Sequence, residues 1–153
     1  MKAAYINPFI NAVRNLFQTM LSLPLKVGQP VLKKDAKPSF DICGVIDISG
    51  EVNGQVVVSM PEPLAIVLAS ELLGEAREML DEDGIDAVGE IANMISGNAK
   101  TDFPGGTSAI SVPRVVVGKD KLTYSAAAPI ISIPCETEKG PLHIDVGLAS
   151  AAR

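Results

Sequence analysis

Hydrophobic residues recur at helical spacing near the start of the chain. After Asn7-Pro8, apolar residues follow one another every three or four positions and predict an amphipathic helix that ends near Leu23-Pro24. The next segment, residues 25–39, holds a glycine, two prolines and a pair of adjacent lysines. This composition predicts a short strand and a loop.

Strand-like patterns dominate the middle and the end of the chain. Residues 40–48 and 55–60 are rich in β-branched side chains and flank Asn53-Gly54, a pair typical of tight turns, so they predict an antiparallel hairpin. Three further runs of this kind lie in the C-terminal third: 110–117, 127–137 and 142–148. The sequence therefore holds enough strands for a sheet.

Two more helices are predicted between the hairpin and the C-terminal strands. The first begins at Pro61 and ends at Gly74, which suits a helix C-cap. The second runs from about Asp83 to Thr101 and has acidic residues in its first turn, where they complement the helix dipole. The order of elements predicts an α+β fold, a single domain over residues 1–153 with helices packed on an antiparallel sheet.

The last of these predicted helices has two different faces. At about 100° of rotation per residue, Asp86, Glu90, Asn93 and Gly97 fall within about 60° of one another. The apolar residues gather on the opposite side: Ile85, Val88, Ala92, Ile95 and Ala99. Glycine inside a helix costs about 1 kcal/mol relative to alanine, so Gly89 and Gly97 weaken this helix. We interpret them as neighbours without side chains, one turn before and one turn after Asn93, which leave the Asn93 side chain accessible to a partner.

Composition narrows the classes of function. The 153 residues carry a net charge of −5, which disfavours a nucleic-acid partner. No signal peptide is recognisable and no apolar run approaches the ~18 residues of a membrane span, so we expect a cytoplasmic protein without membrane insertion. Cys43 and Cys135 lack metal-ligand spacing and are expected to be reduced core residues.

The chemistry available to the polar helix face is limited. His143, the only histidine, is expected to face solvent from a strand, and no Ser-His-Asp set or Cys-His pair is readily assembled. An amide is no general base, but Asn93 can hold a water molecule in line with a labile bond. Phosphoryl transfer suits such help, because it depends mostly on positioning and electrostatics. Glu90 would then anchor a lysine of the partner.

The segment that carries this pair, Asp86–Lys100 with the sequence DAVGEIANMISGNAK, resembles the signature helix of the CheC/CheX/FliY family of response-regulator phosphatases. The segments Tyr5–Ile10 and Ile110–Gly118 are also similar to the CheX branch of this family. Glu-x-x-Asn alone is a weak motif, but the extended motif in this order is specific. The similarity spans nearly the whole chain.

The resemblance implies a CheC-like fold and a protein that is usually a homodimer. It also implies that this protein dephosphorylates the aspartyl phosphate of a CheY-type response regulator in chemotaxis or related two-component signalling. It assigns the docking of the regulator's active-site lysine to Glu90 and the orientation of the attacking water to Asn93. The Mg²⁺ ion belongs to the regulator, so the chain is expected to need no cofactor of its own. A faint internal repeat aligns Asn15 with Glu90 and Gln18 with Asn93. Because the first copy has Asn15 in place of the carboxylate, we predict one active site per chain.

Three other interpretations fit the same residues. In the first, the polar face is an ordinary solvated helix surface. In the second, it belongs to a non-catalytic adaptor that binds a receiver domain or motor component without accelerating hydrolysis. In the third, the small residues of this helix pack against a second copy in a purely structural dimerisation module. Turnover of excess phosphorylated regulator separates the enzyme from the adaptor, and oligomeric state tests the third.

Overall fold

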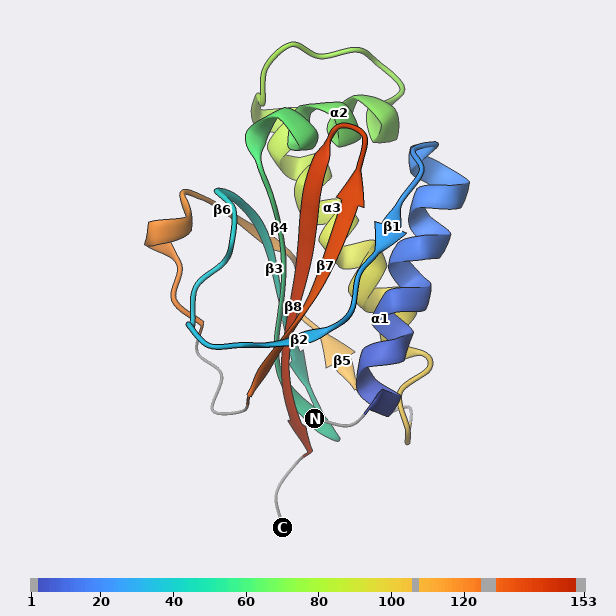
Figure 1. Ribbon diagram of the computed structural model, residues 1–153, viewed down its shortest axis with the longest axis vertical. Helices are drawn as coiled ribbons and strands as arrows, with labels where there is room; N and C mark the ends of the chain where they lie inside the picture. Colours follow the sequence, from blue (N-terminus) through green and yellow to red (C-terminus); the bar gives the residue numbers. More distant parts are fainter. Residues whose placement is uncertain (1–2, 106–107, 125–128, 151–153) are drawn as a thin grey trace.

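Helices lie against one face of an antiparallel sheet in the computed structural model, which describes residues 3–105, 108–124 and 129–150 (Figure 1). The helices in this part of the chain are α1 (Ala3–Leu16), α2 (Glu62–Leu73) and α3 (Glu82–Lys100), with a π-helical turn η1 (Phe17–Leu21) and a short 3₁₀ turn η2 (Lys119–Lys121). The strands are β1 (Lys26–Val27), β2 (Val31–Lys33), β3 (Ile42–Ser49), β4 (Val52–Met60), β5 (Ala109–Ile110), β6 (Arg114–Val117), β7 (Ile130–Thr137) and β8 (Gly140–Ser150). The predicted α+β architecture is confirmed.

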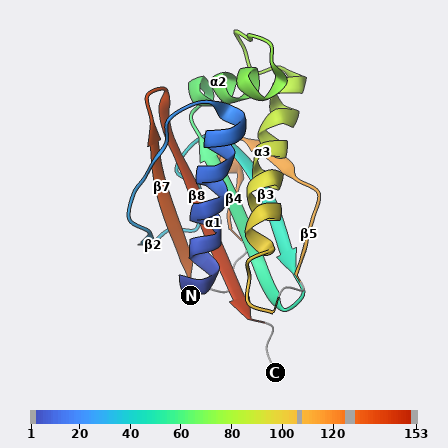
Figure 2. The ribbon, with the colours of Figure 1, turned by 90° about the vertical axis from the view of Figure 1, so that its right-hand side faces the viewer.

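The sheet is antiparallel throughout its described pairs and has the order β1-β7-β8-β4-β3-β5, with β2 also paired to β7 and β6 to β3. Helices α1 and α3 lie side by side along one face, and α2 crosses one end of α3 (Figure 2). The edge formed by β5 and β6 therefore runs next to α3. That neighbourhood determines the surroundings of the candidate site.

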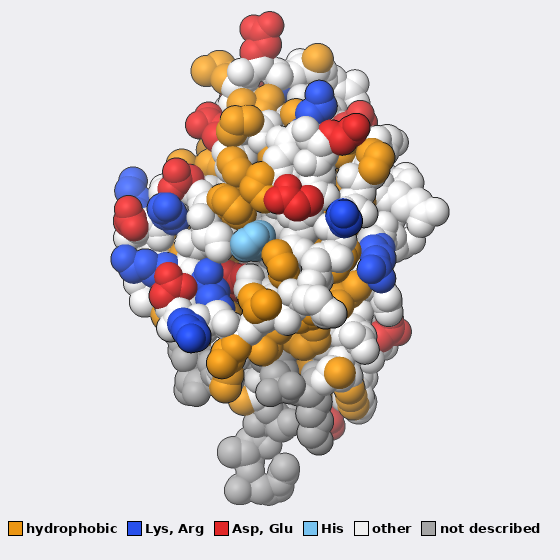
Figure 3. Space-filling model, viewed as in Figure 1, with side chains coloured by type: hydrophobic (Ala, Val, Ile, Leu, Met, Phe, Trp, Pro, Cys, Tyr) orange, Lys and Arg blue, Asp and Glu red, His pale blue; other side chains and the backbone are white. Residues whose placement is uncertain are grey.

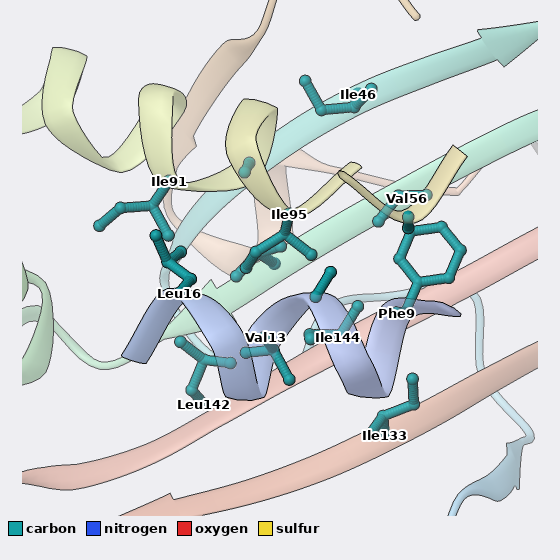
Figure 4. Packing of buried hydrophobic residues seen from close by; sticks show 14 of the residues in the cluster. Phe9, Val13, Leu16, Ile46, Val56, Ile91, Ile95, Ile133, Leu142 and Ile144 are labelled. Carbon is teal, nitrogen blue, oxygen red and sulfur yellow. The ribbon is translucent and has the colours of Figure 1, made fainter. Parts of the chain in front are cut away.

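The main core lies between the helices and the sheet (Figure 4). Each layer contributes fully buried aliphatic or aromatic side chains. They include Phe9, Val13 and Leu16 of α1, Ile91 and Ile95 of α3, and Ile46, Val56, Ile133, Leu142 and Ile144 of the sheet. Burying one such side chain contributes about 1.5–3 kcal/mol, so the core holds α1 and α3 firmly on the sheet.

The opposite face of the sheet has a smaller core of its own. The buried members of this smaller core are Cys43, Val45, Val57, Leu122, Tyr124 and Ile130. Figure 3 views the molecule with β7 and β8 in front, as in Figure 1, and shows hydrophobic side chains between groups of charged ones. The Tyr124 hydroxyl donates a hydrogen bond of 2.5 Å to the buried Asp145 carboxylate, and Lys33 Nζ lies 3.8 Å from the same oxygen. Burial and the Asp145 charge raise the pKa of Tyr124.

The expectation that His143 faces solvent is met only in part. The imidazole is half-buried, its ring centroid lies 4.9 Å from that of Phe40 in an edge-on arrangement, and its Nδ1 lies 3.1 Å from Ser39 Oγ. Burial lowers the pKa of His143. The alternation of polar and apolar residues assigned the correct face of the sheet, but residues 39–40 cover that face locally.

The first helix begins four residues before the predicted start, so the prediction that Asn7-Pro8 opens it is wrong. It starts at Ala3 and contains Pro8. Packing stabilises the additional turn, because the Tyr5 ring lies edge-on to Phe103 with centroids 5.5 Å apart. Pro8 is the sixth residue of the helix, so it lies beyond the first turn and removes the hydrogen bond to the Ala4 carbonyl. The helical conformation continues through η1 and so reaches the predicted end.

The hairpin forms as predicted, but its turn lies at Gly50-Glu51 instead of Asn53-Gly54. Gly50 adopts a φ of 116°, and the Asn53 side chain both accepts from its N–H and donates to its carbonyl at 3.3 Å. Gly54 lies inside β4, where a Cβ would stand 1.9 Å from the Gly147 carbonyl oxygen. Gly54 therefore serves the close approach of β8.

The C-terminal strand predictions are confirmed with changed bounds. The run 110–117 is divided into β5 and β6, because the segment Ser111–Pro113 between them leaves the regular ladder and proline has no N–H for pairing. Within the run 127–137, β7 begins at Ile130, and residues 127–128 lie outside the described part of the chain. The last strand extends beyond both ends of 142–148.

Cys43 and Cys135 are free and buried, one in each core, as predicted. Burial raises the pKa of each thiol to about 12, and the charges of Asp41 and Asp145 add to the effect at Cys43. The unfolded chain therefore loses these protons first, at a pH near the ordinary thiol value. Stability conferred by the protonated thiols is complete below pH ~9 and falls as the pH rises toward 12.

We expect the free energy of unfolding to decrease between about pH 9 and 10.5 by at most about 1.4 kcal/mol per pH unit for each thiol. Urea unfolding at several pH values measures it. Cys43→Ala is expected to flatten this slope while lowering stability at pH 8. An unchanged slope in the Cys43→Ala, Cys135→Ala double variant would assign the pH dependence to other groups.

Candidate functional site

Helix α3 begins at a well-defined N-terminus. The Asp81 side chain caps it by accepting a hydrogen bond of 2.9 Å from the backbone N–H of Gly84. This bond lowers the pKa of Asp81, and the Arg77 guanidinium, whose Nη1 lies 2.6 Å from the carboxylate, lowers it further. Arg77 also lies close to Asp83, so a single arginine contacts carboxylates on both sides of the start of the helix.

The buried side of α3 lies very close to β3. A Cβ at Gly44 would stand 2.8 Å from the Cβ of Ala92 and 3.3 Å from the Val88 carbonyl oxygen. Val88, Ala92 and Ile95 are fully buried in this contact. The missing side chain at Gly44 therefore lets the helix rest almost on the strand, which fixes the direction of its opposite, polar face.

The structure brings Asp86, Glu90 and Asn93 together on the outer face of α3, as predicted. Asp86 and Glu90 are exposed, and Asn93 is partly exposed. Within the part of the chain that the structure describes, neither Glu90 nor Asn93 has a side-chain hydrogen bond or ion pair. Met94 lies half-buried against the main core. A carboxylate and an amide, one turn apart, are thus available to a partner.

The two glycines on either side of Asn93 have different surroundings. Gly89 is buried, and a Cβ there would lie 3.3 Å from Val115 Cγ2 and 3.5 Å from Pro113 Cβ. The interpretation of Gly89 as an exposed neighbour of Asn93 is therefore wrong, because β6 packs directly on it. Gly97 is partly exposed, and the space where its Cβ would stand is open except for Ile110 Cδ1 at 3.7 Å.

The first copy of the faint repeat, Asn15 to Gln18, spans the end of α1 and the start of η1, and α1 packs beside α3. Asn15 is exposed near its C-terminal end, and its carbonyl accepts a hydrogen bond of 2.8 Å from the Thr19 hydroxyl. Gln18 lies in the π-helical turn η1, whose hydrogen bonding differs from that of an α-helix. The helical register around Glu90 and Asn93 is thus not reproduced there. A single active site per chain stays a prediction.

The candidate site is a projecting helix surface. Two open depressions, of about 430 and 600 Å³, lie along α1 instead and share Arg14 in their linings. Small-molecule sites are concave and enclose most of their ligand, whereas exposed side chains on a helix suit a macromolecular partner with a pocket of its own. The geometry therefore favours a macromolecular partner over a small ligand.

Among residues 3–105, 108–124 and 129–150, no group of three or more His, Cys, Asp or Glu side chains is arranged to hold a metal ion. No helix in the same part of the chain is long and apolar enough to cross a bilayer.

Solved structures with this fold define the class. A CheC-like superfamily protein from Shewanella sp. PV-4 superposes with a TM-score of 0.88, at 31% identity over 98% of this chain and 100% of its own. The chemotaxis protein CheX of Vibrio vulnificus gives a TM-score of 0.86, at 32% identity over 95% of this chain and 99% of its own.

The chain belongs to the CheX family. The family profile described as chemotaxis phosphatase CheX matches residues 42–136, which include both Glu90 and Asn93. The CheY-P phosphatase CheX of Thermotoga maritima is 28% identical over 152 residues, which cover 95% of this chain and 97% of that protein. The resemblance seen in the sequence is thereby confirmed at the level of family.

Proposed function

We propose that this chain is a phosphatase that hydrolyses the aspartyl phosphate of a CheY-type response regulator in chemotaxis. Membership of the CheX family and the name of the Thermotoga maritima relative support the activity and the substrate. The observation that carries the site assignment is the pair Glu90 and Asn93 on the outer face of helix α3, where neither side chain has a hydrogen bond or ion pair to any other described residue.

Asn93 is the residue proposed to act in hydrolysis. When α3 docks on the regulator, the Asn93 amide holds a water molecule in line with the bond between phosphorus and the aspartyl oxygen. Fixing the attacking water in this geometry lowers the entropic cost of the reaction, and in-line positioning accounts for much of the catalysis of phosphoryl transfer. The amide donates and accepts hydrogen bonds, so it orients the water without taking its proton.

Glu90 is proposed to dock the regulator. Its exposed carboxylate pairs with a lysine beside the phosphoryl group, and the ion pair fixes the register in which Asn93 meets the water. Asp86, one turn earlier, adds negative charge on the same face. In this proposal the chain contributes no metal ion, and Mg²⁺ is held by the regulator.

Hydrolysis of an excess of phosphorylated regulator distinguishes a phosphatase from a non-catalytic adaptor. A CheY-type regulator from the same genome, phosphorylated with acetyl phosphate in Mg²⁺ and freed of the donor, is mixed with a tenth of its concentration of this protein. Release of phosphate beyond one equivalent per chain, faster than the regulator alone, supports the phosphatase. Binding without acceleration would assign the chain to the non-catalytic adaptors.

We expect Glu90→Gln to raise the KM for the phosphorylated regulator roughly tenfold at low salt, because loss of one charged hydrogen bond costs about 1.5 kcal/mol. Steady-state hydrolysis at 0.05 and 0.5 M salt measures it. The difference from the unmodified protein is expected to shrink at high salt, where exposed charges are screened.

Asp120→Asn is the matched control for this experiment, since it removes the same charge from η2, outside α3. Its KM should equal that of the unmodified protein at both salt concentrations. A salt-independent effect of Glu90→Gln, or an equal effect of Asp120→Asn, would contradict the docking role.

The homodimer, the cytoplasmic location and the extent of the domain over residues 1–153 stay predictions. Sedimentation of the full chain measures its mass in solution. If the chain is instead a structural dimerisation module, Glu90→Gln and Asn93→Ala will change the oligomeric state. The phosphatase proposal expects both variants to keep the mass of the unmodified protein.

A further inference from the structure

Most of the glycines in α3 are explained by the fold. Gly84 and Gly89 are buried, and a Cβ at either position would meet Leu80 or Val115 at 3.1 and 3.3 Å, respectively. Gly97 has no such neighbour: its closest surrounding atom is Ile110 Cδ1 at 3.7 Å, an ordinary contact distance. Alanine would stabilise this helix more than glycine does. Folding therefore gives no reason for glycine at position 97.

The short side chain of Asn93 gives a reason for glycine at position 97. Asparagine is short, so its amide meets a phosphoryl group only if the partner comes up against the backbone of α3. Residues four positions apart on a helix are neighbours, with about 5–6 Å between their Cβ atoms. A side chain on Gly97 would therefore stand in the space through which the partner approaches Asn93.

We propose that Gly97 is a specificity-determining contact, over which the backbone of the phosphorylated regulator lies when Asn93 enters its pocket. The inference rests on the phosphatase function proposed above. Glu90 would then select the partner by charge and Gly97 would select it by shape. Only a partner whose backbone packs directly against α3 fills the space beside Gly97.

The distribution of charge along α3 gives this docking a direction. Asp86 and Glu90 are exposed before Asn93, whereas the exposed residue after Gly97 is the uncharged Asn98. Lys100 is partly buried and donates a hydrogen bond of 3.3 Å to the Ser108 carbonyl. The regulator's cationic group therefore lies toward the N-terminal half of α3, and its neutral backbone lies over Gly97.

Adding side-chain atoms at position 97 tests the inference. For Gly97→Ala we expect kcat/KM for the regulator phosphorylated with acetyl phosphate to fall roughly tenfold, and for Gly97→Leu to fall further, since misplacement by about 1 Å is enough to lose much of the rate. Thermal unfolding is expected to show a melting temperature that is unchanged or higher for the alanine variant.

Asn98→Leu provides the control, because it adds bulk to the adjacent exposed position, about 100° around the helix. It should keep the kcat/KM of the unmodified protein. Full activity of Gly97→Leu, or a lowered melting temperature of Gly97→Ala, would overturn the inference and leave the phosphatase proposal intact. Absence of hydrolysis by the unmodified protein would instead overturn the phosphatase proposal.

Discussion

Asn93→Ala is expected to lower kcat for hydrolysis of the phosphorylated regulator by about 10²–10³-fold, to near the regulator's spontaneous rate. The estimate follows from the loss of a positioned hydrogen-bonding group in the transition state, which typically costs this much. KM is expected to change little, because Glu90 still docks the partner. Stopped-flow measurement of phosphate release under single-turnover conditions separates the chemical step from binding.

The fold should tolerate this substitution. The Asn93 side chain is partly exposed and makes no hydrogen bond within the described residues, and alanine is the better helix former. Asn98→Ala is the matched control: it removes an exposed asparagine from the same helix, about 140° away around the axis. Hydrolysis by Asn93→Ala at the rate of the unmodified protein would refute the mechanism.

The second large effect is expected at the contact between α3 and the sheet. Gly44→Ala places a Cβ 2.8 Å from that of Ala92, at least 0.6 Å closer than the 3.4 Å of ordinary contacts. Overpacking of this kind costs about 2–3 kcal/mol, which corresponds to a decrease in melting temperature of about 5–10 °C for a chain of this size. Thermal and urea unfolding measure both quantities.

A double variant identifies the contact responsible. Ala92→Gly removes the opposing methyl group and is destabilising alone, because glycine weakens a helix by about 1 kcal/mol. Combined with Gly44→Ala, it should restore more than 1 kcal/mol relative to the sum of the two single effects. Gly97→Ala serves as the control, since the same substitution there meets only Ile110 Cδ1, at the ordinary contact distance of 3.7 Å. Strict additivity would show that α3 and β3 do not clash at this point.

The polar face of α3 was predictable from the sequence because it depends on local geometry. The spacing of Glu90 and Asn93 sets their angular separation once the segment is helical, and the buried positions Val88, Ala92 and Ile95 follow from the same period. The cap residues that begin and end such helices, such as Gly74, are also local signals. These predictions needed no knowledge of what the helix packs against.

The predictions that failed concern contacts between distant segments. Gly89 was interpreted through Asn93, its neighbour on the helix, but Val115 of β6 and the preceding Pro113 approach it. His143 is only half exposed, because Phe40, more than a hundred residues earlier in the chain, packs against its ring. Gly54 was assigned to the hairpin turn, but it lies inside β4, where the backbone of β8 comes too close for a side chain. No pattern within a single segment reports such neighbours.

The sequence by itself thus determined the class of fold, the helical frame of Glu90 and Asn93, and the kind of chemistry that a carboxylate and an amide provide. The tertiary structure decided which glycine serves packing and which is free for a partner. The physical reason is that periodicity and caps are properties of neighbouring residues. The space around Gly89 and Gly97 is instead set by strands that reach α3 only after the chain has folded back.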